Sequence, residues 1–342
     1  MEKYRIKKIN LHLFDGTPNT VVTTDKGMKN DIKTYYSDYL IDNAEPELVH
    51  DQFGMKHPIP KNGGKTIEFR KYSPLGKATQ PLVEGVTPDG TKIEMGVITA
   101  EIHQYGAYVT LSDILILTAI DNNIVQATEL LGSQAGRTLD TITREILNGG
   151  SVVQYGDGTK TSRAQLSHAD ANKDTDRLTV TAVRKAVRTL KRMNAPKING
   201  DYVGIIHPDV AYDLMSDPDW KYPHTYVDTE NIYNNEIGKL HGVRFVESTE
   251  AKIWHGTEEP DYCADGESVY STLILGAKAY GVTEVTGGGL THIVKQLGSG
   301  GTTDPLDQRA TVGWKATRAV ERLVEEYMVR IETAAEANSA KN

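Results

Sequence analysis

The sequence predicts an α+β fold in which extended segments accompany two packed regions. Three observations support this prediction: a long run of apolar residues at helical spacing, several strand patterns after it, and two strand-like runs before it that flank a Pro- and Gly-rich segment. With 342 residues, of which 38% are hydrophobic, the chain is long enough for about two domains with cores of their own.

The composition excludes several classes of protein. The formal net charge is −8 and 25% of the residues are charged. A dedicated nucleic-acid binder would be expected to have an excess of basic residues, which this chain lacks. Cys263 is the only cysteine, which excludes an intrachain disulfide and a multi-cysteine metal site. No apolar run approaches the roughly 18 residues of a membrane span, and no apolar signal core follows the start. We therefore expect residence in a cytosol and no membrane partner.

The first 50 residues predict an extended arm with one short helix. Residues 1–29 hold a short apolar patch and a Thr- and Asn-rich stretch without sustained periodicity. A short helix is predicted between Asp31 and Val49, and Pro46 ends or kinks it. The prediction rests on the helical spacing of Ile32, Tyr35, Tyr36, Tyr39 and Leu40.

A long hairpin arm is predicted next. Strand-like runs cover Lys65–Tyr72 and Ile93–Leu111, and residues 73–90 between them contain three prolines and three glycines. A two-stranded arm of this kind is marginally stable alone, so we expect a neighbouring subunit to support it.

The clearest helix in the sequence begins at the Asp121 cap and ends at Gly149-Gly150. At 1.5 Å per residue it forms a rod of about 40 Å, which we expect to serve as a spine. Its apolar stripe, at steps of three and four, consists of Ile124, Ala127, Leu131, Ala135, Leu139, Ile142 and Ile146.

A second helix is predicted after the polar, loop-like residues 157–174. Val180, Val183, Val187 and Leu190 form its apolar face, and Asn194-Ala-Pro196 ends it. A basic face of this kind fits solvent, nucleic acid or another subunit, and the sequence leaves the choice open. The basic face consists of Arg184, Lys185, Arg188, Lys191 and Arg192.

The second half of the chain predicts further strands. A buried strand at Tyr202–His207 precedes a helix that starts at Pro208. Arg309–Arg330 fits a strand in its first part and stays open between strand and helix in the rest. Further strand patterns, separated by turns, lie at Gly242–Glu247, Val269–Leu275, Gly281–Val285 and His292–Leu297.

One local motif imitates a phosphate-binding loop. Asn62-Gly-Gly-Lys-Thr66 ends in Gly-Lys-Thr, but Ile59 stands where the first glycine belongs and a strand pattern follows instead of a helix. We therefore do not assign nucleotide binding to Lys65 and Thr66.

Two further motifs are also incomplete. In Gly298-Ser-Gly-Gly301, Thr303 replaces the third glycine of a dinucleotide fingerprint. In Asp170–Asp176, Thr175 replaces the turn glycine of a calcium loop, and Thr181 replaces its bidentate glutamate.

No constellation of residues predicts catalysis or metal binding. The ten histidines are scattered, none of them paired at the i, i+4 spacing of a metalloenzyme helix. Cys263 lies in an acidic stretch, where carboxylates disfavour a thiolate. The sequence therefore predicts no catalytic, cofactor-binding or metal-binding residues, no cofactor, and a protein that is not an enzyme.

Several phrases, in the correct order, resemble the coliphage N-four major capsid family, one of the tailed-phage major capsid proteins with the Hong Kong 97-type fold. The resemblance covers about Thr34 to Ala334, whereas residues 1–30 and 258–266 fit no pattern. The matching phrases begin with His50-Asp-Gln-Phe-Gly54, Pro58 to Arg70, Gln104-Tyr-Gly106, Val109 to Asp113 and Ala127-Thr-Glu-Leu-Leu131, and continue with His207 to Leu214, Gly242 to Glu247, Asp304 to Arg309 and Thr311 to Lys315.

The resemblance implies a Hong Kong 97-like capsid fold in five parts. An N-terminal arm covers residues 1–50, and the extended hairpin, called the E-loop, covers 51–112 with its flanking strands. A peripheral domain with the long spine helix covers 113–162, and an axial domain covers 163–290. Residues 291–342 return to the peripheral domain and form the tail.

The implied function is self-assembly into pentamers and hexamers that form the icosahedral head shell around the double-stranded DNA of a tailed bacteriophage. We expect the E-loop and the arm to contact neighbouring subunits. The protein would belong to the virion, after assembly in the host cytoplasm. The short N-terminal region implies a separate scaffolding protein, a portal protein is a further implied partner, and a decoration protein is left open.

Two other functions remain alternatives: a tail-tube or sheath subunit, and a nucleotide hydrolase that uses Lys65 and Thr66. Some members of this fold join a hairpin lysine to an asparagine of another subunit, but no signature beside Lys77 or Lys92 identifies a partner. Gly63-Gly64 and Gly149-Gly150 are candidate hinges through which the subunit adapts to different curvatures.

Overall fold

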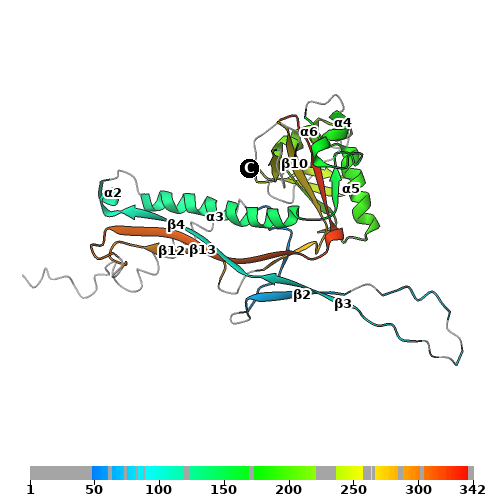
Figure 1. Cartoon of the computed structure of the whole chain (residues 1–342), viewed down its shortest axis with the longest axis horizontal. Coiled ribbons are helices and arrows are strands. Elements are labelled where there is room, and N and C mark those ends of the chain that lie inside the picture. The colour runs from blue at the N-terminus through cyan, green and yellow to red at the C-terminus, as the bar shows by residue number, and fades with distance from the viewer. Residues whose placement is uncertain are drawn as a thin grey trace, which may run out of the picture.

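The computed structural model describes residues 48–337 with the exception of 61–63, 73–74, 82–83, 86, 88, 119–122, 169–172, 221–235, 257–262, 264–265, 284–287 and 301–303. The predicted arm helix, the Asp121 cap and most of Glu258–Gly266 lie outside the described residues. Figure 1 shows a long sheet with one helix along it, a compact sheet-and-helix part at one end, and a projecting hairpin.

The long sheet is organised around β13 (Arg309–Arg322), which pairs antiparallel with β4 (His103–Ser112) and β12 (Thr291–Lys295) along its first part. Its last part pairs with β11 (Tyr280–Thr283), and β1 (Met55–Lys56) joins β11 in parallel. In the segment left open between strand and helix, only a 3-10 turn separates β13 from the next strand, so the helical alternative is wrong.

The predicted spine helix is confirmed as α3 (Asn123–Asn148). Its residues Ala127, Leu131, Ala135 and Leu139 pack on the alternating β13 side chains Val312, Trp314 and Ala316. One face of the long sheet is therefore covered. A short helix, α2 (Asp113–Thr118), follows β4 at the far end of this sheet.

The hairpin consists of β2 (Thr66–Tyr72) and β3 (Met95–Glu101), which pair antiparallel from Thr66↔Glu101 to Tyr72↔Met95. The prediction of one strand over Ile93–Leu111 is wrong, because that run forms two strands. Ile102 separates them: its N–H donates to the Lys65 carbonyl (2.9 Å) and its side chain is buried at the hairpin base. After Ile102 the chain leaves the hairpin and continues as β4.

The compact part contains a seven-stranded sheet. Its order is β5-β14-β10-β6-β8-β7, with β9 also paired to β10. The strands predicted near residues 202, 242 and 269 are confirmed, whereas β5, β7 and β9 were not predicted. The bounds are β5 (Val153–Tyr155), β6 (Tyr202–Ile206), β7 (Glu236–Leu240), β8 (Val243–Glu247), β9 (Ile253–His255), β10 (Ser268–Leu275) and β14 (Met328–Thr333).

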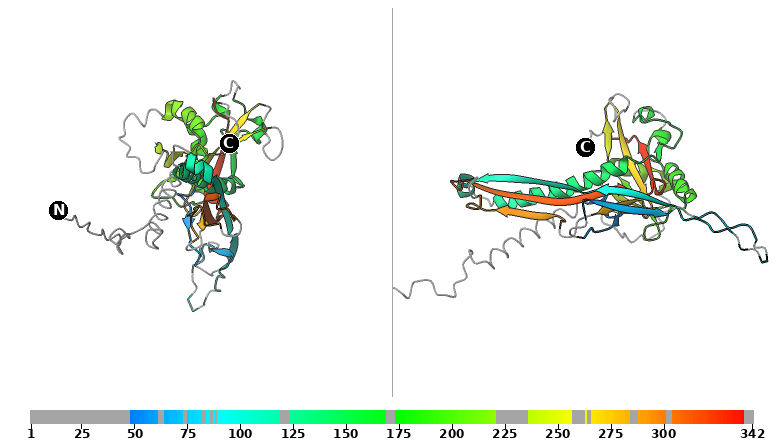
Figure 2. Two further views of the ribbon diagram at one scale, coloured as in Figure 1. Left: turned by 90° about the vertical axis from the view of Figure 1, so that its left-hand side faces the viewer. Right: turned by 60° about the horizontal axis from the view of Figure 1, so that its bottom comes forward.

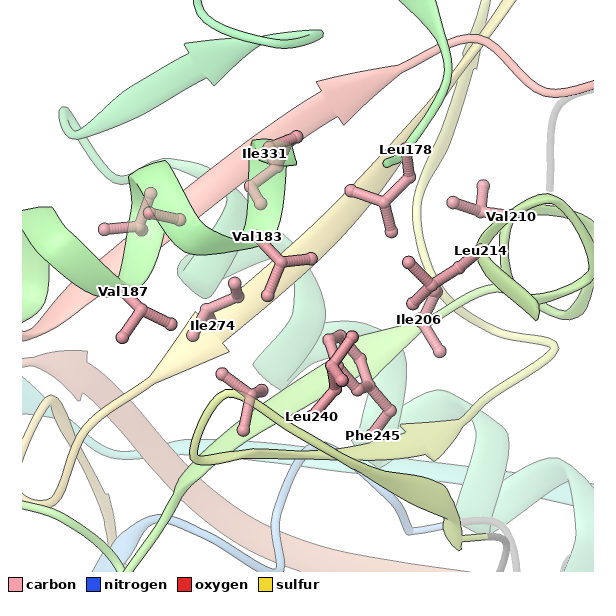
Figure 3. Packing of buried hydrophobic residues seen from close by; sticks show 14 of the residues in the cluster. Leu178, Val183, Val187, Ile206, Val210, Leu214, Leu240, Phe245, Ile274 and Ile331 are labelled. Atoms are coloured by element: carbon pink, nitrogen blue, oxygen red, sulfur yellow. The ribbon is translucent and has the colours of Figure 1, made fainter. Parts of the chain in front are cut away.

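Two predicted helices, α5 (Val180–Arg192) and α6 (Pro208–Ser216), pack on one face of this sheet. Figure 3 shows Val183 and Val187 of α5 beside Ile274 and Ile331 of the sheet. Thr179 and His207 cap the two helices, each accepting a hydrogen bond from a backbone N–H of the first turn. The short helices Arg163–Gln165 and α4 (Lys173–Asp176) precede α5.

The other face of the compact sheet joins it to the long sheet. Val203, Ile205 and Leu273 on this face pack in one cluster with Leu147 at the end of α3 and with Tyr280 of β11. The Ser271 hydroxyl donates to the Asn148 side-chain oxygen at 2.5 Å, which adds a polar contact at the same junction.

Candidate intersubunit surfaces

The Gly-Lys-Thr segment does not form a phosphate site in the structure. Thr66 begins β2 rather than a helix, and Lys65 Nζ lies 2.7 Å from Glu101 Oε1 on the paired strand. Strand amides point alternately to the two sides and cannot converge on a phosphate as helix N-terminal amides do. The segment closes the base of the hairpin.

Three of the described histidines lie at separate places, and each has a partner of its own. His50 contacts Asp140, His168 contacts Glu267, and His255 contacts Ser268. Within the described part of the chain, no three His, Cys, Asp or Glu side chains are grouped so that they could hold a metal ion. Cys263 is buried in a small cluster with Leu166, Trp254 and Val269.

A buried polar cluster holds the point where the predicted N-terminal arm enters the fold. We call it the arm clasp: His50, Asp51, Asp140, Thr143, Tyr280 and Arg318, all of them buried. The carboxylate of Asp140 on α3 accepts from the His50 N–H (2.7 Å) and lies 2.6 Å from its Nδ1. The Tyr280 hydroxyl donates to the His50 carbonyl.

The arm clasp also contains a buried ion pair. Asp51 pairs with Arg318 of β13 and accepts a hydrogen bond from the Thr143 hydroxyl at 2.6 Å. Burial lowers the pKa of Arg318 to about 10, which still leaves the guanidinium charged at neutral pH. The clasp therefore ties α3, β11 and β13 to the root of the arm, and the sequence reasoning missed it.

The hairpin carries an apolar stripe on its outward face. Its inward residues, such as Phe69 and Ala100, are buried at the base. Tyr72, Met95 and Val97 lie on the opposite face, where Tyr72 and Met95 are direct partners, and they are 61%, 49% and 47% exposed. Alternation with period 2 in the sequence is the signal that could have found this stripe.

The far end of the long sheet carries a second apolar surface. Ile114 and Leu117 of α2 are 67% and 81% exposed. The Asp113 N–H donates to the Gln308 carbonyl (3.0 Å), which places α2 beside the loop that carries exposed Leu306. Figure 2 shows this end and the hairpin tip at opposite ends of the molecule. Both ends therefore expose apolar side chains to whatever lies next to the subunit.

An open groove of about 530 Å³ lies on the face of β4, β13 and β12 opposite α3. Gly106 and Gly313 lie in its floor. A Cβ on Gly313 would come within 2.8 Å of the Ala107 carbonyl oxygen and of the Tyr108 Cβ, so glycine is required for the close approach of β4 and β13. Tyr108 and Ile293 flank the floor and are exposed.

Several of the solved structures that resemble this chain are phage capsids. A capsid of Ralstonia phage GP4 matches with a TM-score of 0.65 at 15% identity, over 86% of this chain and 90% of that one. The capsid of cyanophage P-SCSP1u matches at 0.61 and 16% identity, over 84% and 87%. The capsid of Helicobacter pylori bacteriophage KHP30 matches at 0.61 and 10% identity, over 84% and 89%. At these identities the likeness concerns the fold.

A family model described as phage capsid protein matches residues 96–327, which is more than half of the chain. No curated protein sequence matches significantly. In the described part of the chain, none of the helices combines the length and apolarity needed to cross a membrane.

Proposed function

We propose that copies of this chain, which belongs to the phage capsid protein family, assemble as pentamers and hexamers into an icosahedral shell around double-stranded DNA. The chain is a structural protein of the head shell. The Hong Kong 97-type fold of the subunit agrees with the resemblance found in the sequence. The family match does not separate the coliphage N-four group from other phage capsids, so that assignment stays a prediction.

We propose that four of the five parts inferred from the sequence correspond to regions of the subunit, whereas residues 1–47 of the arm lie outside the described residues. The hairpin of β2 and β3 corresponds to the E-loop, and the long sheet with α3 to the peripheral domain. The seven-stranded sheet with α5 and α6 corresponds to the axial domain. β13 supports the idea of a C-terminal return, because residues after 291 pair with β4.

The apolar stripe of the hairpin is the observation that supports assembly most directly. A two-stranded hairpin is marginally stable in water, and this one exposes Tyr72, Met95 and Val97 beyond its base. Burying these side chains against a neighbouring subunit would stabilise both the hairpin and the contact. The exposed apolar side chains of α2, at the opposite end of the molecule, would likewise be buried against a neighbouring subunit.

Purified full-length protein, examined by negative-stain microscopy, tests this function. We expect closed icosahedral particles, because the apolar surfaces at both ends must be buried by other copies. Helical tubes would instead support the alternative of a tail-tube or sheath subunit. Protein that stays monomeric at high concentration, with or without a co-expressed scaffolding protein, would contradict self-assembly.

We further propose a scaffolding protein and a portal protein as partners during assembly in the host cytoplasm, with the finished shell as part of the virion. The groove on β4, β13 and β12 is a candidate surface for a decoration protein. We also propose that the chain catalyses no reaction, which the pairing of Lys65 with Glu101 supports against the hydrolase alternative. A nucleotide-dependent thermal shift of the wild type would contradict this.

A further inference from the structure

A ridge of exposed cations lies along α5. We call Arg184, Arg188 and Arg192, with Lys191 beside them, the basic ridge. All four side chains are exposed. The opposite side of α5 is buried, as Figure 3 shows for Val183 and Val187. The sequence pattern shows that these cations share one face of the helix. The structure shows in addition that, within the described part of the subunit, no other element packs over them.

The ridge reduces the stability of the isolated subunit. Arg184, Arg188 and Arg192 follow each other at i, i+4 spacing, where like charges on a helix repel each other. The helix dipole favours cations in the last turn, which accounts for Lys191 and Arg192 but not for Arg184 in the first half of α5. Among the described residues, no carboxylate forms an ion pair with the ridge.

Nearby lysines differ from the ridge because they are neutralised. Lys185 Nζ lies 3.3 Å from Asp157 Oδ2, and Lys160 Nζ lies 3.3 Å from Asp176 Oδ1. These lysines and Arg188 line a hollow of about 250 Å³ beside the helix. Since the two lysines already have carboxylate partners, the excess positive charge on this side of the protein comes from the ridge.

The positive field of the ridge also affects a neighbouring side chain. Burial lowers the pKa of His241, and the charges of Arg184 and Lys191 lower it further. Asp219 acts in the opposite direction but does not cancel the effect. The ridge therefore acts as a local positive region on a protein whose formal net charge is −8.

The chemistry of the ridge indicates which partner it fits. Every apolar residue of α5 is buried, so the exposed face offers no apolar centre for a protein interface. Arginine forks match phosphate oxygens in pairs. The ridge extends about 12 Å along the helix, and one strand of DNA presents about three phosphates over that length.

We propose that the basic ridge binds the phosphate backbone of double-stranded DNA and that α5 therefore lies on the lumen side of the shell. This inference rests on the proposed function, because DNA is the polyanion that the shell would enclose. We expect the contact to be independent of sequence, because contacts to phosphate oxygens carry no direct information about the bases.

The test compares full-length wild type with the variant Arg184→Gln, Arg188→Gln, Arg192→Gln. The matched control is Lys77→Gln, Lys92→Gln, Lys295→Gln, which removes the same charge from exposed sites elsewhere. Binding of a 20-base-pair duplex is measured by fluorescence anisotropy between 50 and 200 mM NaCl. Circular dichroism and negative-stain microscopy of each protein report folding and shell formation.

We expect the ridge variant to lower the salt slope of DNA binding by about 2.7, so that wild type loses about 40-fold more affinity than the variant over this salt range. The control should keep the wild-type slope. An unchanged slope in the ridge variant, or no measurable binding by wild type, would overturn the inference. So would loss of shells with unchanged DNA binding, which would assign the ridge to a subunit contact. Failure of wild type to form shells would count against the proposed function alone.

Discussion

At the scale of single residues, the arm clasp combines burial with charge. Asp51, Asp140 and Arg318 lie in the interior, where an unpaired charge is costly and a paired one is tolerated. The partners come from sequence positions at least 90 residues apart, so no local pattern marks them. In the sequence, His50 and Asp51 belong to a phrase that resembles the capsid family, and nothing near them indicates their physical role.

Replacing Asp51 by Asn tests the clasp. The Asn side-chain oxygen can still accept from Thr143, but Arg318 would stay buried and charged without the carboxylate of Asp51. We expect the unfolding free energy of unassembled subunits to fall by about 3–5 kcal/mol in urea denaturation. Glu101→Gln, which removes the exposed ion pair with Lys65, is the control and should leave the unfolding midpoint unchanged. Equal midpoints for Asp51→Asn and wild type would show that the pair contributes nothing.

At the scale of elements, the hairpin differs from the long sheet and from the seven-stranded sheet. β4, β12 and β13 are backed by α3, and the seven-stranded sheet has packed side chains on both faces. The hairpin is packed only at its base, by the cluster around Phe69 and Ile102. Its period-2 pattern was readable in the sequence, but the end of β3 was not, because Ile102 looks like any other apolar residue of a strand.

The double change Met95→Thr, Val97→Thr tests the hairpin stripe. Threonine keeps the strand preference, while each replaced side chain would lose about 1.5–3 kcal/mol of burial at a subunit contact. We expect unchanged thermal unfolding of the subunit and a clear loss of shells in sedimentation and microscopy. Glu68→Gln with Thr99→Ser, a directly paired couple on the same outward face, is the control. Wild-type shell yields from the stripe variant would contradict the proposed contact.

At the scale of the whole molecule, the glycines proposed as hinges have different surroundings, and Gly63 lies outside the described residues. Gly64 has φ +95°, a backbone conformation that other residues rarely take, and open space where a Cβ would stand. A Cβ on Gly149 or Gly150 would instead come within 2.7 Å of Arg322 or 2.8 Å of Met328. Close packing therefore explains why glycine stands at positions 149 and 150. Gly64 remains a candidate hinge.

The hinge makes a prediction about assembled shells. We expect hairpins of subunits at five-fold and six-fold positions to differ by a rotation at Gly64, measurable by cryo-electron microscopy. Gly64→Ala should lower the yield of closed shells, because a left-handed backbone is strained with a Cβ. Gly76→Ala, at an open position without that backbone angle, is the control. Hairpins that superimpose in both environments, with unchanged angles at Gly64, would disprove the hinge.

The sequence by itself determined the fold class, the spine helix, α5, α6 and most strands, because helical and strand periods reflect one buried face of each element. The order of matching phrases also identified a phage capsid protein, whereas the coliphage N-four assignment stays a prediction. Only the tertiary structure decided that Arg309–Arg322 is one long strand and that Ile102 ends the hairpin, because pairing with β4 and burial at the base depend on residues far apart in sequence. The arm clasp and the exposure of the basic ridge were also decided only by the tertiary structure. Burial and ion pairing depend on which residues lie close together in space.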